Sequence, residues 1–399
     1  MIDSQQGALA TSPDMVSKSS PSWIYPRAAY LHIPFCAHKC GYCDFASVAG
    51  QDDLADRYLV ALESEISRTL SSQTLVDTIF VGGGTPTRLN SGQLEQFCRT
   101  TQRHFQLSQN GEWTVEANPG TLDAEKVEIL KSHGVTRISL GAQSFNLDAL
   151  AALERNHNPS DVFRSVDLIK SAGLNWSIDL IFGAPGSNSS VWETDMDIAL
   201  SLSPDHLSCY GLIYEKGTAL WKQLQAGQVE PIPEETEANM YERTIERLAE
   251  SGLIQYEISN YARPGFECRH NLVYWANDAY FGFGLGAARY MNGLRATNIR
   301  DLPGYIRRME QGLDATGPSE QLTLEERARE TATLMIRRVQ MGINRADFLT
   351  RTGFSIDELA GPSIIKHIQN GLLTDDGSTI RLTRQGVMLG DTVASDFLD

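Results

Sequence analysis

Three of the six cysteines in this chain lie close together, as Cys36, Cys40 and Cys43 in the segment HIPFCAHKCGYCDF. Three neighbouring thiolates can ligate three irons of a four-iron cluster, which leaves the fourth iron open to a substrate or cofactor. Structural zinc is the alternative, but zinc usually takes four protein ligands, often from paired C-x2-C motifs, and no second pair lies nearby. His38 could serve as a fourth zinc ligand only in a cramped position between two cysteines. The C-x3-C-x2-C spacing therefore favours an iron–sulfur cluster over zinc.

A glycine-rich run, Val81-Gly82-Gly83-Gly84-Thr85-Pro86, follows the second β-rich segment of the chain. Because glycine has no Cβ, the backbone of this run can approach a ligand closely, and the proline fixes the direction in which the chain leaves. No Gly-Lys-Ser or Gly-Lys-Thr continuation follows, so the run is not a nucleotide triphosphate loop. On its own the segment fits either a ligand-binding loop or an ordinary turn.

Polar residues also lie near the ends of three further β-rich segments: Glu116 in VEANPGT, Gln143 in SLGAQSF and Asp179 in SIDLIFGAPG. In a β/α barrel the carboxyl ends of the strands carry the active site. Each residue alone also fits a helix cap or a buried polar group with local partners. Together with the cysteine loop, which follows the first strand, they predict one shared pocket.

Short β-rich runs alternate with longer helical segments from residue 28 onwards. We expect strands at 28–33, 78–82, 113–117, 136–141, 176–183 and 206–212. We expect helices at 55–70, 91–105, 124–134, 159–173 and 234–252, because apolar residues recur there three or four positions apart. Successive β/α units predict a parallel sheet, and six are too few for an eight-unit barrel. The expected fold class is therefore α/β, with a partial (β/α)6 barrel.

After about residue 300 the alternation of β-rich and helical segments ends. A predicted helix at 322–339 is followed by short helical segments at INRADFLTRTG and IIKHIQNGLL, and then by a hairpin around DDGS. This pattern predicts a small α+β, winged-helix-like domain, whose fold alone does not identify a function. We therefore divide the chain into a disordered tail at 1–22, a barrel with an extension at 23–300, and a C-terminal α+β domain at 301–399.

The overall charge and the absence of targeting signals bear on location and partners. The chain has 399 residues, with 34 basic and 50 acidic side chains and a net charge of −16, so nucleic acid is not an expected partner. Its first residues show no basic region followed by an apolar one, and no run reaches the roughly 18 apolar residues of a membrane span. We expect a cytoplasmic location, with reduced thiols and at most peripheral membrane contact.

The cysteine segment HIPFCAHKCGYCDF resembles the signature of the radical S-adenosylmethionine (radical SAM) superfamily. Within it, the chain resembles the oxygen-independent coproporphyrinogen III oxidase group, and most closely the HemW branch of haem chaperones, over about residues 25 to 395. The resemblance implies that the three clustered cysteines hold a [4Fe–4S] cluster. It also implies that the open iron chelates the amino and carboxylate groups of S-adenosylmethionine, and that the fold is a radical SAM barrel with a HemN-like C-terminal domain.

The same resemblance implies a set of cofactor contacts. It assigns S-adenosylmethionine binding to Gly83, Gly84, Thr85, Glu116, Gln143, Arg155 and Asp179, with Tyr30 and Tyr42 flanking the cofactor. Carboxylates suit ribose hydroxyls and ammonium groups as strong acceptors, and an arginine suits a carboxylate by bidentate pairing. No catalytic residue is assigned with certainty.

A second segment, Glu267-Cys268-Arg269-His270-Asn271-Leu272-Val273-Tyr274-Trp275, contains the pattern His270-Asn271-x-x-Tyr274-Trp275, which resembles a stretch of the HemW branch associated with haem. Either His270 or Cys268 could be an axial iron ligand, and the two aromatic residues could stack on a porphyrin. A packed turn with a hydrogen-bonded histidine explains the segment equally well.

Two functions of different classes follow from the resemblance. One is a haem chaperone that carries haem to a receiving protein; the other is a coproporphyrinogen dehydrogenase-type oxidoreductase of porphyrin biosynthesis. The oxidase converts propionates to vinyls by a radical route and needs an electron donor, as would any cleavage of S-adenosylmethionine. The oxidase branch carries a fourth cysteine two positions beyond the third, where this chain has Phe45. That difference and the segment around His270 favour the chaperone.

Overall fold

Six parallel strands form the centre of the molecule. The computed structural model describes residues 21–291 and 293–398, so the predicted disordered tail lies outside the described residues as far as residue 20. The parallel strands, in their order across the sheet, are β1 (Ala28–Ile33), β4 (Thr74–Gly83), β5 (Phe105–Ala117), β6 (Arg137–Gln143), β7 (Asn175–Phe182) and β8 (His206–Gly211). The expected partial (β/α)6 barrel is confirmed.

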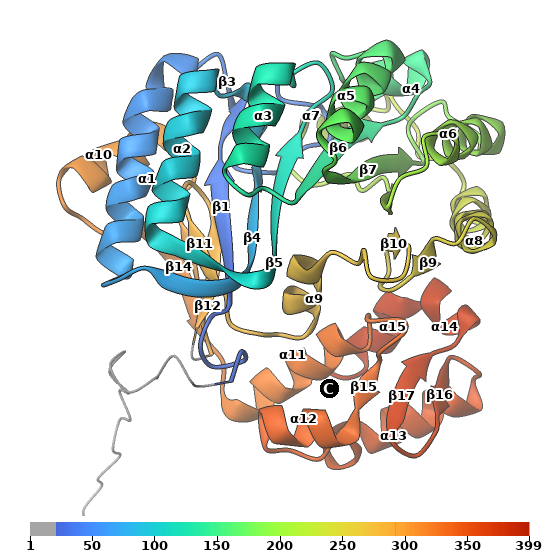
Figure 1. Cartoon of the computed structure of the whole chain (residues 1–399). Helices are drawn as coiled ribbons and strands as arrows, with labels where there is room; N and C mark the ends of the chain where they lie inside the picture. Colours follow the sequence, from blue (N-terminus) through green and yellow to red (C-terminus); the bar gives the residue numbers. More distant parts are fainter. Residues whose placement is uncertain (1–20, 292, 399) are drawn as a thin grey trace, which may run out of the picture.

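Helices cover the outer face of this sheet (Figure 1). They are α1 (Ala55–Thr69), α2 (Ser91–His104), α3 (Ala124–Ser132), α4 (Leu147–Ala152), α5 (Pro159–Ala172), α6 (Ser189–Ser201) and α8 (Glu234–Glu250). The short helix α7 (Ala219–Gln225) lies instead at the carboxyl ends of the strands, where the Leu220 amide donates to the Gly41 carbonyl. Each strand alternates between the two faces of the sheet, so Ile138 and Leu140 of β6 pack in the core while Arg137 and Ser139 face the barrel interior. Cys98 and Cys209 also lie in the core.

Local sequence signals set the helix boundaries. Asn90 caps α2 in a reciprocal capping box with Gln93, and Asn158 does the same for α5 with Asp161. Gly173 ends α5 in a left-handed conformation, with φ of 71°, which costs glycine little because it has no Cβ. These caps explain why the expected helices begin and end close to the observed residues.

Shorter strands extend the sheet at both edges. Strand β11 (Phe281–Phe283) pairs parallel with β1, while β10 (Asn260–Ala262) pairs antiparallel with β8 and with β9 (Ile254–Gln255). The order therefore runs from β11 at one edge to β9 at the other, and within the described residues the barrel remains open.

A three-stranded antiparallel sheet joins the two sides of the expected domain boundary. It consists of β12 (Ala288–Met291), β13 (Leu294–Asn298) and β14 (Thr316–Gln321), and α10 (Leu302–Glu310) packs against α1. The boundary expected at residue 300 thus separates two strands that pair with each other. We propose instead that residues 301–321 belong with the barrel and that the C-terminal domain begins at α11.

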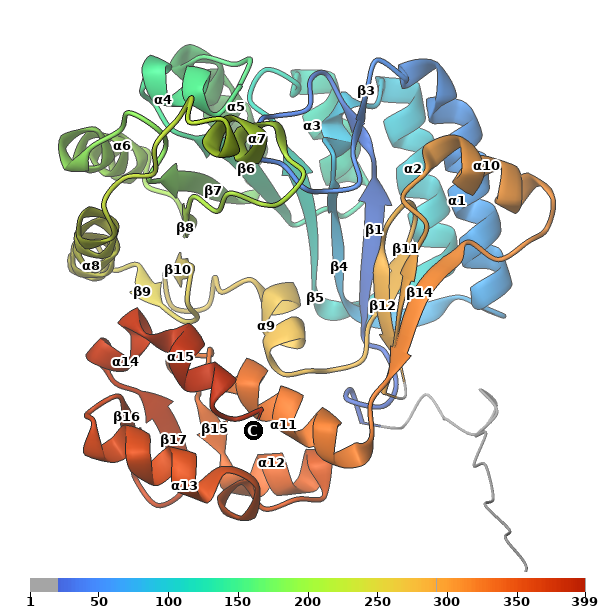
Figure 2. The same cartoon turned by 180° about the vertical axis from the view of Figure 1, so that it is seen from behind.

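The C-terminal domain lies beyond the lower end of the barrel strands, next to α9 (Arg269–Trp275), as Figures 1 and 2 show. Its elements are α11 (Leu324–Met335), β15 (Ile343–Asn344), α12 (Arg345–Thr352), α13 (Ile356–Gln369), β16 (Leu373–Asp375), β17 (Thr379–Leu382), α14 (Arg384–Met388) and α15 (Gly390–Ser395). The strands form a small antiparallel sheet in the order β15-β17-β16, as expected for a winged-helix-like α+β unit. Among the described residues, no helix combines the length and apolar character needed to cross a bilayer.

Candidate functional site

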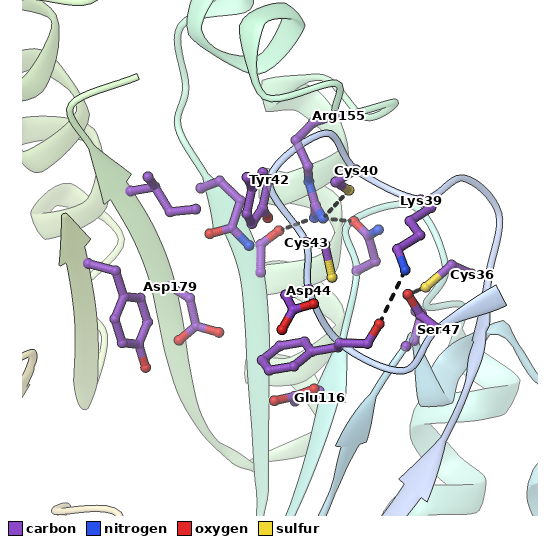
Figure 3. A pocket seen from close by; sticks show the side chains of 18 of the residues that line it. Cys36, Lys39, Cys40, Tyr42, Cys43, Asp44, Ser47, Glu116, Arg155 and Asp179 are labelled. Carbon is purple, nitrogen blue, oxygen red and sulfur yellow. Dashed lines mark hydrogen bonds between the residues drawn. The ribbon is translucent and has the colours of Figure 1, made fainter. Parts of the chain in front are cut away.

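A cavity of about 470 Å³ opens at the carboxyl ends of the parallel strands. The cysteine loop, the glycine run at the end of β4 and the polar ends of β5, β6 and β7 line it (Figure 3). The predicted site residues that line this cavity are Cys36, Cys40, Tyr42, Cys43, Gly83, Gly84, Thr85, Glu116, Gln143, Arg155 and Asp179. Residues 143 positions apart in sequence, Cys36 and Asp179, therefore meet in one place, because successive parallel strands bring their ends to the same edge.

The cysteine loop is closed at its base by two short parallel strands. Cys36 belongs to β2 (Phe35–Cys36), which pairs with β3 (Val48–Ala49), and the Cys43 amide donates to the Cys40 carbonyl at 3.1 Å. The three thiols are free and half-buried. Burial raises the pKa of Cys36 and of Cys43, so these groups are protonated thiols until a metal displaces the proton.

The thiols do not converge on one point. Among residues 21–291 and 293–398, no three His, Cys, Asp or Glu side chains are placed as they would be around a single metal ion. A cluster differs from a zinc ion in this respect, because each cysteine binds a separate iron corner. The preference for a multi-iron group over one zinc comes from the C-x3-C-x2-C spacing of the loop.

The glycine run lies where side chains would collide. A Cβ on Gly82 would lie 2.6 Å from Glu116 Oε2, and one on Gly83 would lie 2.2 Å from the His32 ring. Gly83 also has a φ of +108°, which only glycine adopts readily, and its amide donates to Glu116 Oε2 at 3.1 Å. The run thus brings bare backbone to the cavity wall and fixes the carboxylate of Glu116.

Two carboxyl groups lie deep in the cavity. The cavity reaches Glu116 and Asp179, yet the surrounding protein withdraws both from bulk water. Burial, followed by the charge of Asp179, raises the pKa of Glu116 to about 8, and burial raises that of Asp179 to about 6. Ser139 Oγ donates to both oxygens of Asp179, at 3.2 and 3.1 Å. The site therefore holds protons that a cationic ligand could displace.

Arg155 is bound to the cysteine loop in this structure. Its Nη1 donates to Cys40 Sγ at 3.3 Å, and its Nη2 donates to Asn118 Oδ1 at 2.8 Å and to the Gly141 carbonyl at 2.7 Å. Its Nε has no partner in the described structure. The guanidinium therefore fixes one cysteine and leaves one buried N–H group without a partner in the described structure.

Tyr30 is the predicted cofactor contact that does not line the cavity. Its hydroxyl lies 2.9 Å from His32 Nδ1, and His32 Nε2 lies 3.0 Å from the Ala46 carbonyl at the end of the cysteine loop. Burial lowers the pKa of His32 to about 4, so the ring is neutral and can accept from Tyr30 while donating to Ala46. Tyr30 therefore reaches the cysteine loop indirectly, through the hydrogen bonds of His32.

The segment predicted to hold haem lies elsewhere, on α9 at the opposite end of the barrel (Figure 1). His270 is fully buried, with Nδ1 2.8 Å from Thr78 Oγ1 and Nε2 2.8 Å from the Tyr274 hydroxyl. Burial lowers its pKa to about 3. Both ring nitrogens are occupied, so iron ligation by His270 requires one of these hydrogen bonds to break.

The other haem candidates have different surroundings. Cys268 is buried and its thiol donates to Glu112 Oε1 at 3.6 Å. Cys268 and Asn271 line a second cavity of about 200 Å³ inside the barrel, which shares Glu116 and Asp179 with the main cavity. Trp275 faces the Arg337 guanidinium, 5.7 Å from its ring centre. The structure therefore does not gather these residues into one open site.

Sequence reasoning missed several residues of the main cavity. Asn118 lies two positions after Glu116, and Tyr210 lies at the end of β8, so the rule of polar residues at strand ends could have found both. Glu154 and Gln143 are non-glycine residues with positive φ, of 55° and 65°. The sequence contains no signal that predicts a positive φ at a non-glycine residue. Such backbone strain is often found at functional sites.

Comparisons with known proteins identify the family and the fold of this chain. The model of the radical SAM superfamily matches residues 30–198, and that of the HemN C-terminal domain matches residues 322–389. A curated relative, the heme chaperone HemW of Bacillus subtilis, is 40% identical over 93% of this chain and 99% of its own length. The heme chaperone HemW of Escherichia coli is 32% identical over 94% of this chain and 98% of its own length.

A solved structure has the same fold. Coproporphyrinogen III oxidase (HemN) from Escherichia coli, which is described as a radical SAM enzyme, matches with a TM-score of 0.82. The match covers 95% of this chain and 91% of that one at 21% sequence identity. The likeness extends over the barrel and the C-terminal domain together, so it supports the whole architecture.

Proposed function

Because this chain belongs to the heme chaperone HemW family within the radical SAM superfamily, we propose that it is a haem chaperone, which binds haem and passes it to a receiving protein. Membership of the superfamily also implies a [4Fe–4S] cluster and S-adenosylmethionine as cofactors. The observation that carries the cofactor part of the proposal is the 470 Å³ cavity in which the cysteine loop, the glycine run and the two raised-pKa carboxyls meet.

The residues of the cavity fit these cofactors. Three thiols from one loop match three irons, glycines leave backbone bare at the wall, and Arg155 keeps an unpartnered Nε. When bound, the cluster supplies a reducible centre with one open iron for S-adenosylmethionine. In our proposal Cys36, Cys40 and Cys43 hold the cluster.

The protein's own groups would bind and orient the second cofactor. The Gly83, Gly84 and Thr85 segment offers backbone contacts, and Glu116 and Asp179 offer acceptors to its cationic and hydroxyl groups. We also propose contacts from Tyr42, Gln143 and Arg155, which line the cavity, and an indirect role for Tyr30 through His32.

The haem site is proposed separately, at the α9 segment. In this proposal His270 or Cys268 ligates iron after a local opening, while Asn271, Tyr274 and Trp275 complete the contact. A haem-receiving protein is the expected partner, together with an electron donor where S-adenosylmethionine is cleaved. We also propose a cytoplasmic location, because the three clustered cysteines must stay reduced to ligate iron.

One anaerobic experiment tests the proposal. Cluster-reconstituted protein is titrated with haem, then mixed with an apo-haemoprotein, and assayed in parallel with coproporphyrinogen III and S-adenosylmethionine. We expect stoichiometric haem binding, haem transfer, and no protoporphyrinogen. Turnover of coproporphyrinogen III, or failure to bind haem, would overturn the chaperone assignment.

A further inference from the structure

The turn between α4 and α5 contacts the cysteine loop through two consecutive residues, Glu154 and Arg155. Glu154 has a φ of +55°, in the left-handed region that side chains rarely adopt, although it is not glycine. A non-glycine residue persists in such a conformation only where its surroundings hold it. The contacts of its side chain identify those surroundings.

Glu154 packs against the middle of the cysteine loop. A Cβ built on Gly41, between Cys40 and Tyr42, would lie 3.0 Å from the Glu154 carboxyl carbon. The Glu154 carboxylate also lies 3.5 Å from His38 Nε2 and accepts from Gln223 Nε2 at 3.3 Å. Since the pair with His38 is partly exposed, packing against Gly41 matters more than charge.

The loop is held from the opposite side as well. The Leu220 amide at the start of α7 donates to the Gly41 carbonyl at 2.8 Å. Gly41 thus lies between Glu154 and α7, and it has no room for a larger residue without displacement of the carboxylate. Within the cysteine triplet, the Cys43-to-Cys40 backbone bond is a further local restraint.

Arg155 continues the same contact onto a cysteine. Its guanidinium bridges Cys40 Sγ to Asn118 Oδ1 and the Gly141 carbonyl, which belong to the ends of neighbouring strands. A charge-assisted N–H···S bond stabilises negative charge on sulfur, and such bonds tune the properties of iron–sulfur centres. Asn118 fixes the guanidinium and so acts on Cys40 indirectly, through Arg155.

We propose that the α4–α5 turn is a positioning device for the cysteine loop, in which Glu154 and Asn118 are positioning residues for Cys40. The inference rests on the proposed cluster site and adds residues that neither the cysteine motif nor the family comparison identifies. Glu154 restrains the loop at Gly41, and Asn118 restrains the guanidinium that bonds the cysteine.

Glycine substitution at a strained position gives a matched pair of variants. Glu154→Gly relieves the left-handed strain and removes the carboxylate, while Ser203→Gly relieves the same kind of strain, with φ of 54°, at the opposite end of the barrel. Both apo-proteins should melt at or above the wild-type temperature. After reconstitution, a ferrous chelator should remove iron about tenfold faster from Glu154→Gly, as expected for the loss of about two packed methylene groups at Gly41. It should remove iron from Ser203→Gly at the wild-type rate.

Two further variants separate a positioning role from general stability. Glu154→Gln keeps the packing and should retain most of the wild-type resistance to the chelator. Asn118→Ala should alter the electron paramagnetic resonance spectrum of the reduced cluster while leaving the melting temperature of the apo-protein within a few degrees. Wild-type rates of iron loss in Glu154→Gly, or an unchanged spectrum in Asn118→Ala, would overturn the inference. If the wild type itself assembles no cluster, the proposed function fails first.

Discussion

If Glu116 contacts S-adenosylmethionine as we propose, its raised pKa makes cofactor binding sensitive to pH. Its pKa is raised to about 8, so the group is mostly protonated at pH 7 in the cavity without ligand. S-adenosylmethionine carries a permanently charged sulfonium, and it should bind best to the carboxylate form. Binding below pH 8 must therefore expel the proton, and affinity should rise as the pH rises through 8.

The magnitude follows from the distance between the working pH and this pKa. Each unit below pH 8 costs about a factor of ten in affinity, so binding at pH 7 should be roughly tenfold, and at pH 6 roughly a hundredfold, weaker than at pH 9. Asp179, with a pKa near 6, steepens the loss only below that value. Close to one proton should be released for each ligand bound at pH 7.

Calorimetric titration under anaerobic conditions can measure both quantities. Wild type and Glu116→Gln are titrated with S-adenosylmethionine from pH 6 to pH 9 in two buffers of different ionisation enthalpy. The amide keeps an oxygen acceptor for the Gly83 amide but carries no titratable proton. Because both proteins bind the same ligand, the ratio of their affinities cancels the titration of the ligand's own amino group.

The ratio of wild-type to variant affinity should increase roughly a hundredfold between pH 6 and pH 9. A constant ratio across this range would refute the reasoning, since Glu116 would then bind no cationic group as a carboxylate. A ratio that falls with pH would show that the ligand needs the protonated acid. Neither result would affect the assignment of the cysteines.

Other perturbations have equally definite outcomes. Alanine at any one of the three loop cysteines should abolish the broad visible absorption of the cluster, and full iron and sulfide content after the triple change would remove them as ligands. His270→Ala should weaken haem binding in an absorbance titration while the cluster stays intact. Tyr274→Phe should tighten haem binding, because it frees Nε2 of His270 from its hydrogen bond. Unchanged affinities in both variants would place the haem ligand elsewhere. Gly83→Ala should weaken S-adenosylmethionine binding at least tenfold, because the added Cβ would collide with the His32 ring and alanine disfavours a φ of +108°. Equal affinity would show that the glycine run adapts to the extra carbon. Glu112 and Arg137 form a buried ion pair, with 3.1 Å between Oε2 and Nη2. Glu112→Gln should lower the free energy of unfolding by about 3 kcal/mol in a urea titration, because it leaves the Arg137 charge unpaired. A change under about 1 kcal/mol would mean that water reaches the pair.

The sequence predicted the barrel well because its signals are local. Hydrophobic periodicity distinguishes strand from helix, and each cap is contained within four residues, as in Asn90 with Gln93. Helix α6, which the expected helices omit, shows the limit of this reasoning. Its amphipathic pattern is weak because Asp195 is buried on the inner face, where it accepts from Ser144 and Phe145 of another segment.

The domain boundary illustrates the same limit on a larger scale. The alternation of β-rich and helical segments does end near residue 300, but β14 pairs with β13 across that position. Hydrogen bonds between strands depend on which edges are free in space, and composition along the chain carries no such information. We therefore propose that residues 301–321 belong with the barrel.

The amino-acid sequence by itself determined the cysteine triplet, the glycine run and the order of strand ends, and a parallel sheet then requires these features to meet at one edge. Tertiary structure alone decided the partners of individual side chains. It placed Tyr30 behind the cavity, bound both nitrogens of His270 and brought Arg155 to Cys40, 115 positions away. The physical reason is that secondary structure follows from interactions within a few residues, whereas a polar side chain is satisfied by whichever acceptor or donor the packed chain brings within about 3 Å.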